Sequence, residues 1–138
     1  MSATQPRIAK RFTHHFDVVS SDIDELGHAG NVAWVRWVND AATAHSRSVG
    51  LDLPAYLELG LLWVVRRHDI EYLAPALVGD AIDATTWIDD VHGATSTRKT
   101  EFHHAGRLLA RASTTWALLR IDTGRPTRIP AELIRRYE

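Results

Sequence analysis

Residues 31–49 restrict the possible folds more than any other segment, because they predict one long helix that is apolar over much of its surface. Apolar residues recur every three or four positions in NVAWVRWVNDAATAHSRSV, the spacing of an amphipathic helix. Trp34, Trp37 and Ala41 form a second apolar row beside the first. Gly50 follows, and glycine accepts the left-handed backbone found just past a helix end. So wide an apolar surface needs cover from other elements. The first row consists of Val32, Val35, Val38, Ala42, His45 and Val49.

Most of the remaining chain has the pattern of β-strands. In the last apolar run, aliphatic residues alternate with Arg, Ser and Thr, as in a strand with one buried face. Short turns at 91–93 and 104–106 suit antiparallel neighbours. A strand, a long helix and then four strands indicate an α+β fold, with an antiparallel sheet wrapped around the helix. The predicted strands are 11–20, 61–72, 80–90, 94–104 and 107–121, with a short element near 54–59.

Composition narrows the class of protein. A chain of 138 residues predicts a single domain, 1–138, with residues 1–10 as a loose leader. Sixteen basic and seventeen acidic residues give a net charge of −1, which creates no general attraction to nucleic acid or membranes. The absence of cysteine excludes disulfides, zinc–thiolate sites and cysteine nucleophiles. No apolar run approaches the ~20 residues of a membrane span or has the form of a signal peptide. We therefore expect a soluble, cytoplasmic protein without nucleic-acid or membrane partners.

The stretch DIDELGHAGN (22–31) concentrates polar residues just before the helix. Its beginning resembles an EF-hand calcium loop, which requires an oxygen ligand at its fifth position and a glutamate at its twelfth. Counted from Asp22, those positions hold Leu26 and Ala33. Calcium binding is therefore rejected.

Two other interpretations of this stretch remain open. In the first it is only a turn, with Asn31 or Asp24 capping the helix and glycines providing the turn geometry. In the second it is an active-site loop, because the backbone N–H groups near residues 30–33 can stabilise an oxyanion that forms on a substrate carbonyl. Asp24 would then act as nucleophile or as general base for a water molecule.

The segment DIDELGHAGNVAWVRW resembles the D-x-D-x-x-G-H-x-N-N-x-x-Y signature of hotdog-fold acyl-CoA thioesterases, the group that includes 4-hydroxybenzoyl-CoA thioesterase and the YbgC-like enzymes. Further resemblance lies in VVRRHDIEYLAPALVGD, GRLLARA and TGRPTRIP, so that it extends over roughly residues 12–130 in the same order. It implies a five-stranded antiparallel sheet around a long central helix. It also implies hydrolysis of an acyl-CoA or related thioester by a homodimer or homotetramer, with the active site between subunits.

The same resemblance assigns roles to particular residues. Asp24 corresponds to the catalytic carboxylate of the family, and Asp22 to an acceptor that shapes the loop. His28 and Asn31 match motif positions that hold the loop or contact the thioester. Gly30 stands where the family has the first Asn of its pair, and Trp34 stands near a common Tyr. No metal or redox cofactor is expected, and coenzyme A enters as part of the substrate.

Substrate-binding candidates lie farther along the chain. Trp63 is a candidate for the acyl pocket. Arg66 or Arg67 could bind a phosphate of coenzyme A as a fork, although a solvated edge or an ion pair with Asp69 or Glu71 is the simpler interpretation. In relatives the turn at 92–99 often contacts the nucleotide end, where Thr95, Ser96, Arg98 and Lys99 could donate to phosphates.

Other chemistries find less support. The pairs His14–His15 and His103–His104 fall on predicted strands, where neighbouring side chains diverge and cannot chelate one metal. No G-x-S-x-G sequence exists for a serine nucleophile. Two alternatives stay open: a non-catalytic module that binds or senses acyl-CoA, and a hotdog dehydratase or hydratase that would use His28.

Overall fold

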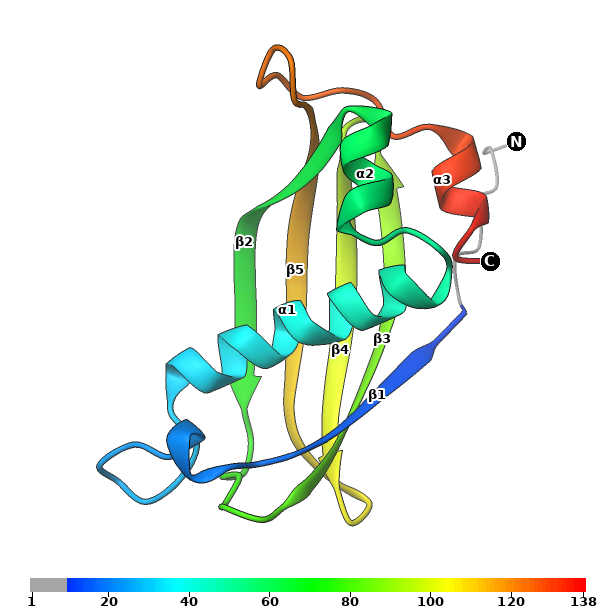
Figure 1. Cartoon of the computed structure of the whole chain (residues 1–138). Helices are drawn as coiled ribbons and strands as arrows, with labels where there is room; N and C mark the ends of the chain where they lie inside the picture. The colour runs from blue at the N-terminus through cyan, green and yellow to red at the C-terminus, as the bar shows by residue number, and fades with distance from the viewer. Residues whose placement is uncertain (1–9) are drawn as a thin grey trace.

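Five antiparallel strands form one curved sheet, and the helix α1 lies across its concave face (Figure 1). This computed structural model describes residues 10–138, so nearly all of the expected leader lies outside the described residues. The strand order is β1-β3-β4-β5-β2, which confirms the predicted α+β architecture. The strands are β1 (Phe12–Asp17), β2 (Leu61–Tyr72), β3 (Ala81–His92), β4 (Thr95–His104) and β5 (Arg107–Arg120). The helices are α1 (Asn31–Ser48), α2 (Leu53–Leu59) and α3 (Ala131–Arg135), with a 3-10 turn η1 (Ser20–Asp22).

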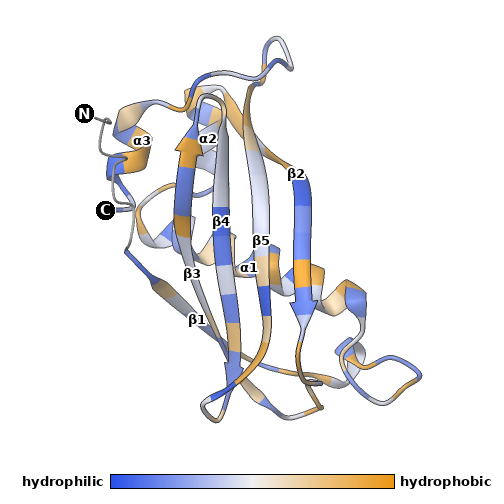
Figure 2. Ribbon diagram, turned by 180° about the vertical axis from the view of Figure 1, so that it is seen from behind, coloured by the Kyte–Doolittle hydropathy of each residue, from blue (hydrophilic) through white to orange (hydrophobic). Residues whose placement is uncertain are grey.

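Alternation along the central strands separates an inner from an outer face. On β4, Arg98 is buried against the helix side, whereas the next residue, Lys99, is only half-buried on the opposite face. Phe102 also points inward and is fully buried. The outer face of the sheet carries many hydrophilic residues (Figure 2). The inner face therefore holds the core, together with a few buried polar groups that bear on function.

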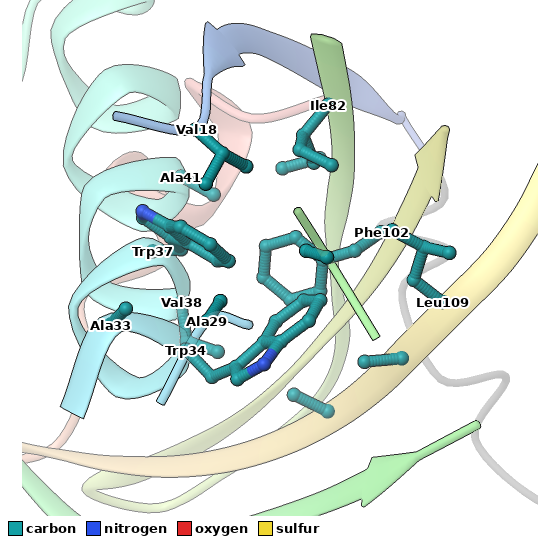
Figure 3. Packing of buried hydrophobic residues seen from close by; sticks show 14 residues of the cluster. Val18, Ala29, Ala33, Trp34, Trp37, Val38, Ala41, Ile82, Phe102 and Leu109 are labelled. Carbon is teal, nitrogen blue, oxygen red and sulfur yellow. The ribbon is translucent and has the colours of Figure 1, made fainter. Parts of the chain in front are cut away.

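An aromatic cluster joins the first half of α1 to the sheet (Figure 3). The Trp34 ring meets Trp37 edge-on at 4.8 Å between centroids and Phe102 at 5.3 Å. Edge-to-face pairs of this kind add to the free energy gained by burying the rings. A second apolar cluster, which includes Leu51, Tyr56 and Leu118, packs under α2 and α3 at the other end of the helix.

The helix α1 differs in detail from its prediction. Its buried face includes Trp34, Trp37 and Val38, as expected, but Val32 is 81% exposed. Gly30 occupies the N-cap position, so Asn31 is the first helical residue and not the cap. The predicted stop is close to the observed end, since Val49 is the C-cap and Gly50 has φ +82°. The short helix α3 was not predicted.

A search of the described helices for a membrane span found none with the necessary length and hydropathy.

The aromatic cluster generates a stability prediction. Trp34→Ala should lower the free energy of unfolding by about 3–5 kcal/mol, because it removes a large buried side chain and leaves a cavity. Asp40→Ala, at an exposed position of the same helix, should change it by less than about 0.5 kcal/mol. Denaturant unfolding followed by circular dichroism measures both. Equal losses in the two variants would contradict the assignment of the buried face.

Candidate active site

The loop before α1 is closed by its own backbone. Ile23 and Ala29 form an antiparallel bridge, and the Asp24 N–H donates to the His28 carbonyl at 3.0 Å. Gly27 has φ +87°, a left-handed conformation that suits glycine at the tip of the turn. The Ala29 N–H donates to the Ala76 carbonyl at 2.9 Å, which attaches the loop to the segment between β2 and β3. The loop, shown in Figure 1 before the start of α1, is thus held in one place.

Asp22 fixes the beginning of this loop. Its buried carboxylate accepts a hydrogen bond from the Val19 N–H at 3.0 Å and pairs with the Arg36 guanidinium. The Asp22 carbonyl accepts from the Gly30 N–H at 3.2 Å. These three interactions are of the kind expected for a residue that shapes the loop.

Asp24 is exposed and lies beside the start of α1. Its Oδ1 accepts from the Leu26 N–H at 2.8 Å, which turns the chain and orients the carboxylate. A Cβ placed on Gly30 would lie 3.2 Å from both Cβ and Oδ2 of Asp24. The Asp24 carboxylate therefore occupies space that opens because residue 30 has no side chain. An asparagine at position 30, as in the related motif, would press on this carboxylate.

Free backbone donors lie next to that carboxylate. The first hydrogen bond of α1 runs from the Trp34 N–H to the Gly30 carbonyl at 3.3 Å, so the amides of residues 31–33 have no acceptor within the helix. Gly30 offers no side-chain cap, and the first turn contains no acidic residue. An exposed carboxylate beside unpaired amides at the positive end of a helix is suited to attack on a carbonyl carbon. The sequence had suggested the Gly30 N–H as a further donor. It is not available, because it already donates to the Asp22 carbonyl.

His28 and Asn31 lie in this region, but only His28 forms a hydrogen bond within the loop. The His28 carbonyl accepts from Asp24, while its half-exposed ring forms no hydrogen bond with the described residues. Asn31 is exposed on the first turn, and its side chain likewise bonds to nothing in residues 10–138.

The other predicted binding residues do not gather at this loop. Thr95 is the first residue of β4, and its hydroxyl donates across the turn to the His92 carbonyl at 2.9 Å. Ser96 is paired with Trp116 and lies inside, only 7% exposed. So buried a hydroxyl does not fit the expected contact with a phosphate at the surface. Arg98 is also buried and does not fit this contact either. Strand β3 runs from the end where the Asp24 loop attaches to the turn before Thr95, a distance of roughly 36 Å along the strand.

Arg66 and Arg67 remain exposed on β2. A register shift between Val65 and Arg67 lets Arg66 bulge from the strand. The alternative ion pairing with Glu71 is not formed, because Glu71 pairs with Arg111 at 2.6 Å. Neither arginine has an ion-pair partner in the part of the chain that the structure describes.

Trp63 lines a pocket of about 200 Å³ that reaches from the core to the surface at the exposed Asp52 and Leu53, and we call it the interior pocket. It lies between the second half of α1, the helix α2 and the sheet, with Ser96 and Arg98 on its sheet side. The pocket begins near Ala42, so it is roughly 16 Å along the helix from the first turn of α1. The aromatic cluster occupies the intervening stretch of the helix.

A buried polar network that the sequence did not reveal borders this pocket. One guanidinium nitrogen of Arg98 donates to His45 Nδ1 at 2.9 Å and to the Thr86 hydroxyl at 3.1 Å. Because arginine only donates, Nδ1 must accept, so His45 carries its proton on Nε2. Burial, reinforced by the charge of Arg98, lowers the pKa of His45 to about 4. The helical spacing had suggested His45 only as part of an apolar row.

No cluster of three or more potential metal ligands occurs among the described residues. His14 faces inward and stacks on Phe16, whereas His15 faces outward and lies 2.6 Å from Asp83. The two side chains diverge, as expected for neighbours on a strand.

Comparison with known proteins gives the context for this geometry. Residues 9–137 match the family described as Acyl-ACP thioesterase N-terminal domain. A chloroplastic acyl-acyl-carrier-protein hydrolase, FATB3, from Cuphea viscosissima is 27% identical over 130 residues, which cover 88% of this chain and 32% of that relative. The chain therefore spans about a third of the length of the curated relatives it matches.

Solved structures show the same fold. A hypothetical protein from Aquifex aeolicus superimposes with a TM-score of 0.86 at 20% identity, covering 92% of this chain and 99% of that one. A 1,4-dihydroxy-2-naphthoyl-CoA thioesterase from Synechocystis gives a TM-score of 0.84 at 21% identity, covering 92% and 95%. The expected hotdog architecture is confirmed.

The network around His45 predicts a pH effect on stability. An unfolded His45 titrates near 6.5 and the folded one near 4, so between these values the unfolded chain binds more protons. Stability should therefore fall as the pH drops from about 6.5 to 4, by on the order of 2 kcal/mol from this residue. Denaturant midpoints measured across that range in wild type and His45→Gln test this.

The glutamine variant should lose this part of the pH dependence. His92→Gln, at an exposed position on the β3–β4 turn, serves as control and should keep the wild-type slope. The assignment is wrong if both variants respond to pH as the wild type does.

Proposed function

This chain belongs to the family of the acyl-ACP thioesterase N-terminal domain, and on that premise we propose that it hydrolyses an acyl thioester at the Asp24 loop. One observation carries the proposal: an exposed carboxylate, oriented by its own loop, lies against the N-cap Gly30 of a helix whose first amides are unpaired. These are the groups that thioester hydrolysis needs.

In the proposed reaction the thioester carbonyl sits over the first turn of α1. The amides of residues 31–33 stabilise the oxyanion that forms when the carbonyl carbon is attacked. With Asp24 as general base, a water molecule gives its proton to the carboxylate and forms the new C–O bond. The C–S bond then breaks, and the thiolate leaves and is protonated. With Asp24 as nucleophile, an anhydride forms first and water hydrolyses it.

A single turnover in ¹⁸O-labelled water detects the covalent route when water cleaves the anhydride at the aspartyl carbon. General-base catalysis places the label only in the released acid. Label recovered in the Asp24 carboxylate would identify a covalent intermediate.

The substrate proposed here is an acyl group on coenzyme A or on an acyl carrier protein. The names of the family and of the relative from Cuphea viscosissima include acyl carrier protein. The name of the similar Synechocystis protein includes CoA. Arg66 and Arg67 are exposed cations without a partner in residues 10–138, so they can meet a phosphate of either carrier.

We also infer that the protein is a homo-oligomer with the Asp24 loop near the interface. Large apolar side chains are exposed in that loop and just after it. Leu26 in the loop is 77% exposed, and Val32 on the first turn of α1 is 81% exposed. Leu77 and Val78 are exposed in the segment to which the loop is bonded. Exposed apolar surface of this kind is typical of protein contacts.

The catalytic role of Asp24 can be tested by replacing one atom. Asp24→Asn keeps an oxygen that can accept from the Leu26 N–H, so the turn should persist while the carboxylate is lost. We expect turnover to fall by about 10²–10⁴. Thiol release from short, long and aromatic acyl groups, each on coenzyme A and on acyl carrier protein, measures it and identifies the carrier.

Glu25→Gln is the matched control, because it removes a neighbouring exposed acid of the same loop. It should retain activity within a few-fold. Equal activity in Asp24→Asn and wild type would mean that the loop is only a turn. Tight acyl-CoA binding by a folded wild type that never releases thiol would favour a non-catalytic binding module.

If the protein is an oligomer, light scattering after gel filtration should give a molar mass above the 15.5 kDa of one chain. Val32→Asp should lower that mass, because it places a charge in the proposed contact. The monomer should tolerate an acid there, since an acid in the first turn of a helix is favourable. Leu57→Asp, at a 51% exposed position on α2, should leave the mass unchanged. A wild type that runs as a monomer would remove the interface proposal.

A further inference from the structure

We propose that the interior pocket binds a small carboxylic acid, whose carboxylate pairs with the buried Arg98 while its apolar body fills the space between α1, α2 and the sheet. This site is separate from the Asp24 loop and does not depend on thioester hydrolysis. The proposal depends on three features of the pocket: its size, its donors and its lack of a counter-charge.

Size and lining limit the ligand. The pocket has a volume of about 200 Å³ and is walled mainly by apolar and aromatic side chains, among them Leu51, Ile88 and Trp63. A cavity of about 150 Å³ in another protein accepts benzene. The interior pocket therefore has room for one ring or a short chain together with a carboxylate. A fully hydrophilic anion would leave these apolar walls without contacts.

Arg98 supplies the charge. Its side chain is 5% exposed, and it lines the pocket from the centre of β4. A guanidinium has five N–H donors, but only one nitrogen of Arg98 has hydrogen-bond partners, and both partners are neutral groups on His45 and Thr86. Tyr137 offers its ring at 5.8 Å from the guanidinium carbon. These contacts hold the side chain in place without neutralising its charge.

No carboxylate compensates this cation within residues 10–138. None of the ion pairs there includes Arg98. Asp52 is the one acid on the pocket wall, and its side chain accepts from the Ala55 N–H as the cap of α2. A buried charge without a partner is costly, so an anion that enters the pocket removes a penalty in addition to making new contacts.

Trp116, another residue of the same wall, also has a donor without a partner. Its indole N–H has no acceptor among the described residues, but the nitrogen is enclosed and does not itself open onto the pocket. The donors available to a ligand are therefore the free N–H groups of Arg98, which can only donate. They call for a ligand that accepts, and a carboxylate offers two oxygens with about four acceptor positions. This combination favours an acid over a neutral apolar molecule.

Two kinds of ligand present such a carboxylate: a free acid, and an acyl group that ends in a carboxylate. In both cases the apolar part lies against the same walls, and the anion reaches Arg98. The experiment below therefore includes both kinds of ligand.

The test titrates benzoate into the full-length protein and follows the total tryptophan fluorescence, to which Trp63 and Trp116 of the pocket wall contribute, with calorimetry as a second readout. Benzamide and benzyl alcohol, which have nearly the same shape without the charge, are titrated in parallel. We expect benzoate to bind at least about 10-fold more tightly than either neutral analogue. This comparison uses wild-type protein alone, so it does not depend on whether a variant folds.

Arg98→Met removes the charge with little change in side-chain length and should weaken benzoate binding by at least about 10-fold. Lys99→Met is the matched control: it removes the same charge from the next residue, on the opposite face of β4, and should bind benzoate as the wild type does. Asp24→Asn should also bind benzoate normally. Failure of hydrolysis at the Asp24 loop would therefore leave this result unaffected.

A second arm titrates the Asp24→Asn protein with thioesters whose acyl group ends in a carboxylate, against thioesters that end in the corresponding amide. An Arg98-dependent preference for free acids identifies the ligand as a free acid. The same preference seen only with thioesters identifies it as the end of an acyl group. Equal binding of charged and neutral ligands, or no binding of either kind, would overturn the proposal.

Discussion

The packing of one apolar helix into one curved sheet is the constraint on which the rest of this structure depends. The helix α1 has aromatic and aliphatic residues on more than one side, and only a sheet that curls around it can cover them. Trp34 packs edge-on against Trp37, one turn later in the helix, and against Phe102 of the sheet. This contact fixes the rotation of the helix, and with it the direction in which the loop before the helix presents its side chains.

The same helix therefore serves two separate regions. Its first turn places unpaired amides beside Asp24, at a loop that is bonded to the segment between β2 and β3. Its last turns place His45 and Ser46 near the buried Arg98 and Tyr137. The aromatic cluster lies between these regions and keeps them apart. One rigid element thus supports an exposed carboxylate at one end and an enclosed cation at the other.

The electrostatics of the interior show why a histidine faces Arg98. A protonated His45 could not accept from the guanidinium, and two adjacent buried cations would repel each other. Burial and the charge of Arg98 lower the pKa of His45, so the ring stays neutral and can accept. The Thr86 hydroxyl accepts from Arg98 and Thr100 and donates to the Lys99 carbonyl, which uses all of its capacity. The network positions the arginine without supplying an anion.

Local patterns in the sequence determined most of the elements. The helical spacing of apolar residues predicted the long helix nearly to its ends. The strand patterns predicted four of the five strands to within about two residues at each boundary. The motif at 22–31 also located Asp24 and Asp22, because their positions relative to the helix follow from a few residues of chain. Asn31 was a good cap by type, yet Gly30 holds the N-cap position, where a Cβ would lie 3.2 Å from the Asp24 carboxylate.

Tertiary structure decided everything that depends on residues far apart in the chain. Ser96 and Arg98 carry groups that normally seek water, but the pleat of β4 turns them inward, because the parity of that strand is set by Phe102 in the core. The wall of the interior pocket comes from α1, α2, four strands and Tyr137 near the C-terminus, so no single stretch of sequence could reveal it. The sequence determined which elements form and where the Asp24 loop lies relative to the helix. Only the packing of those elements decided which charged side chain is enclosed, because burial is a property of the whole fold.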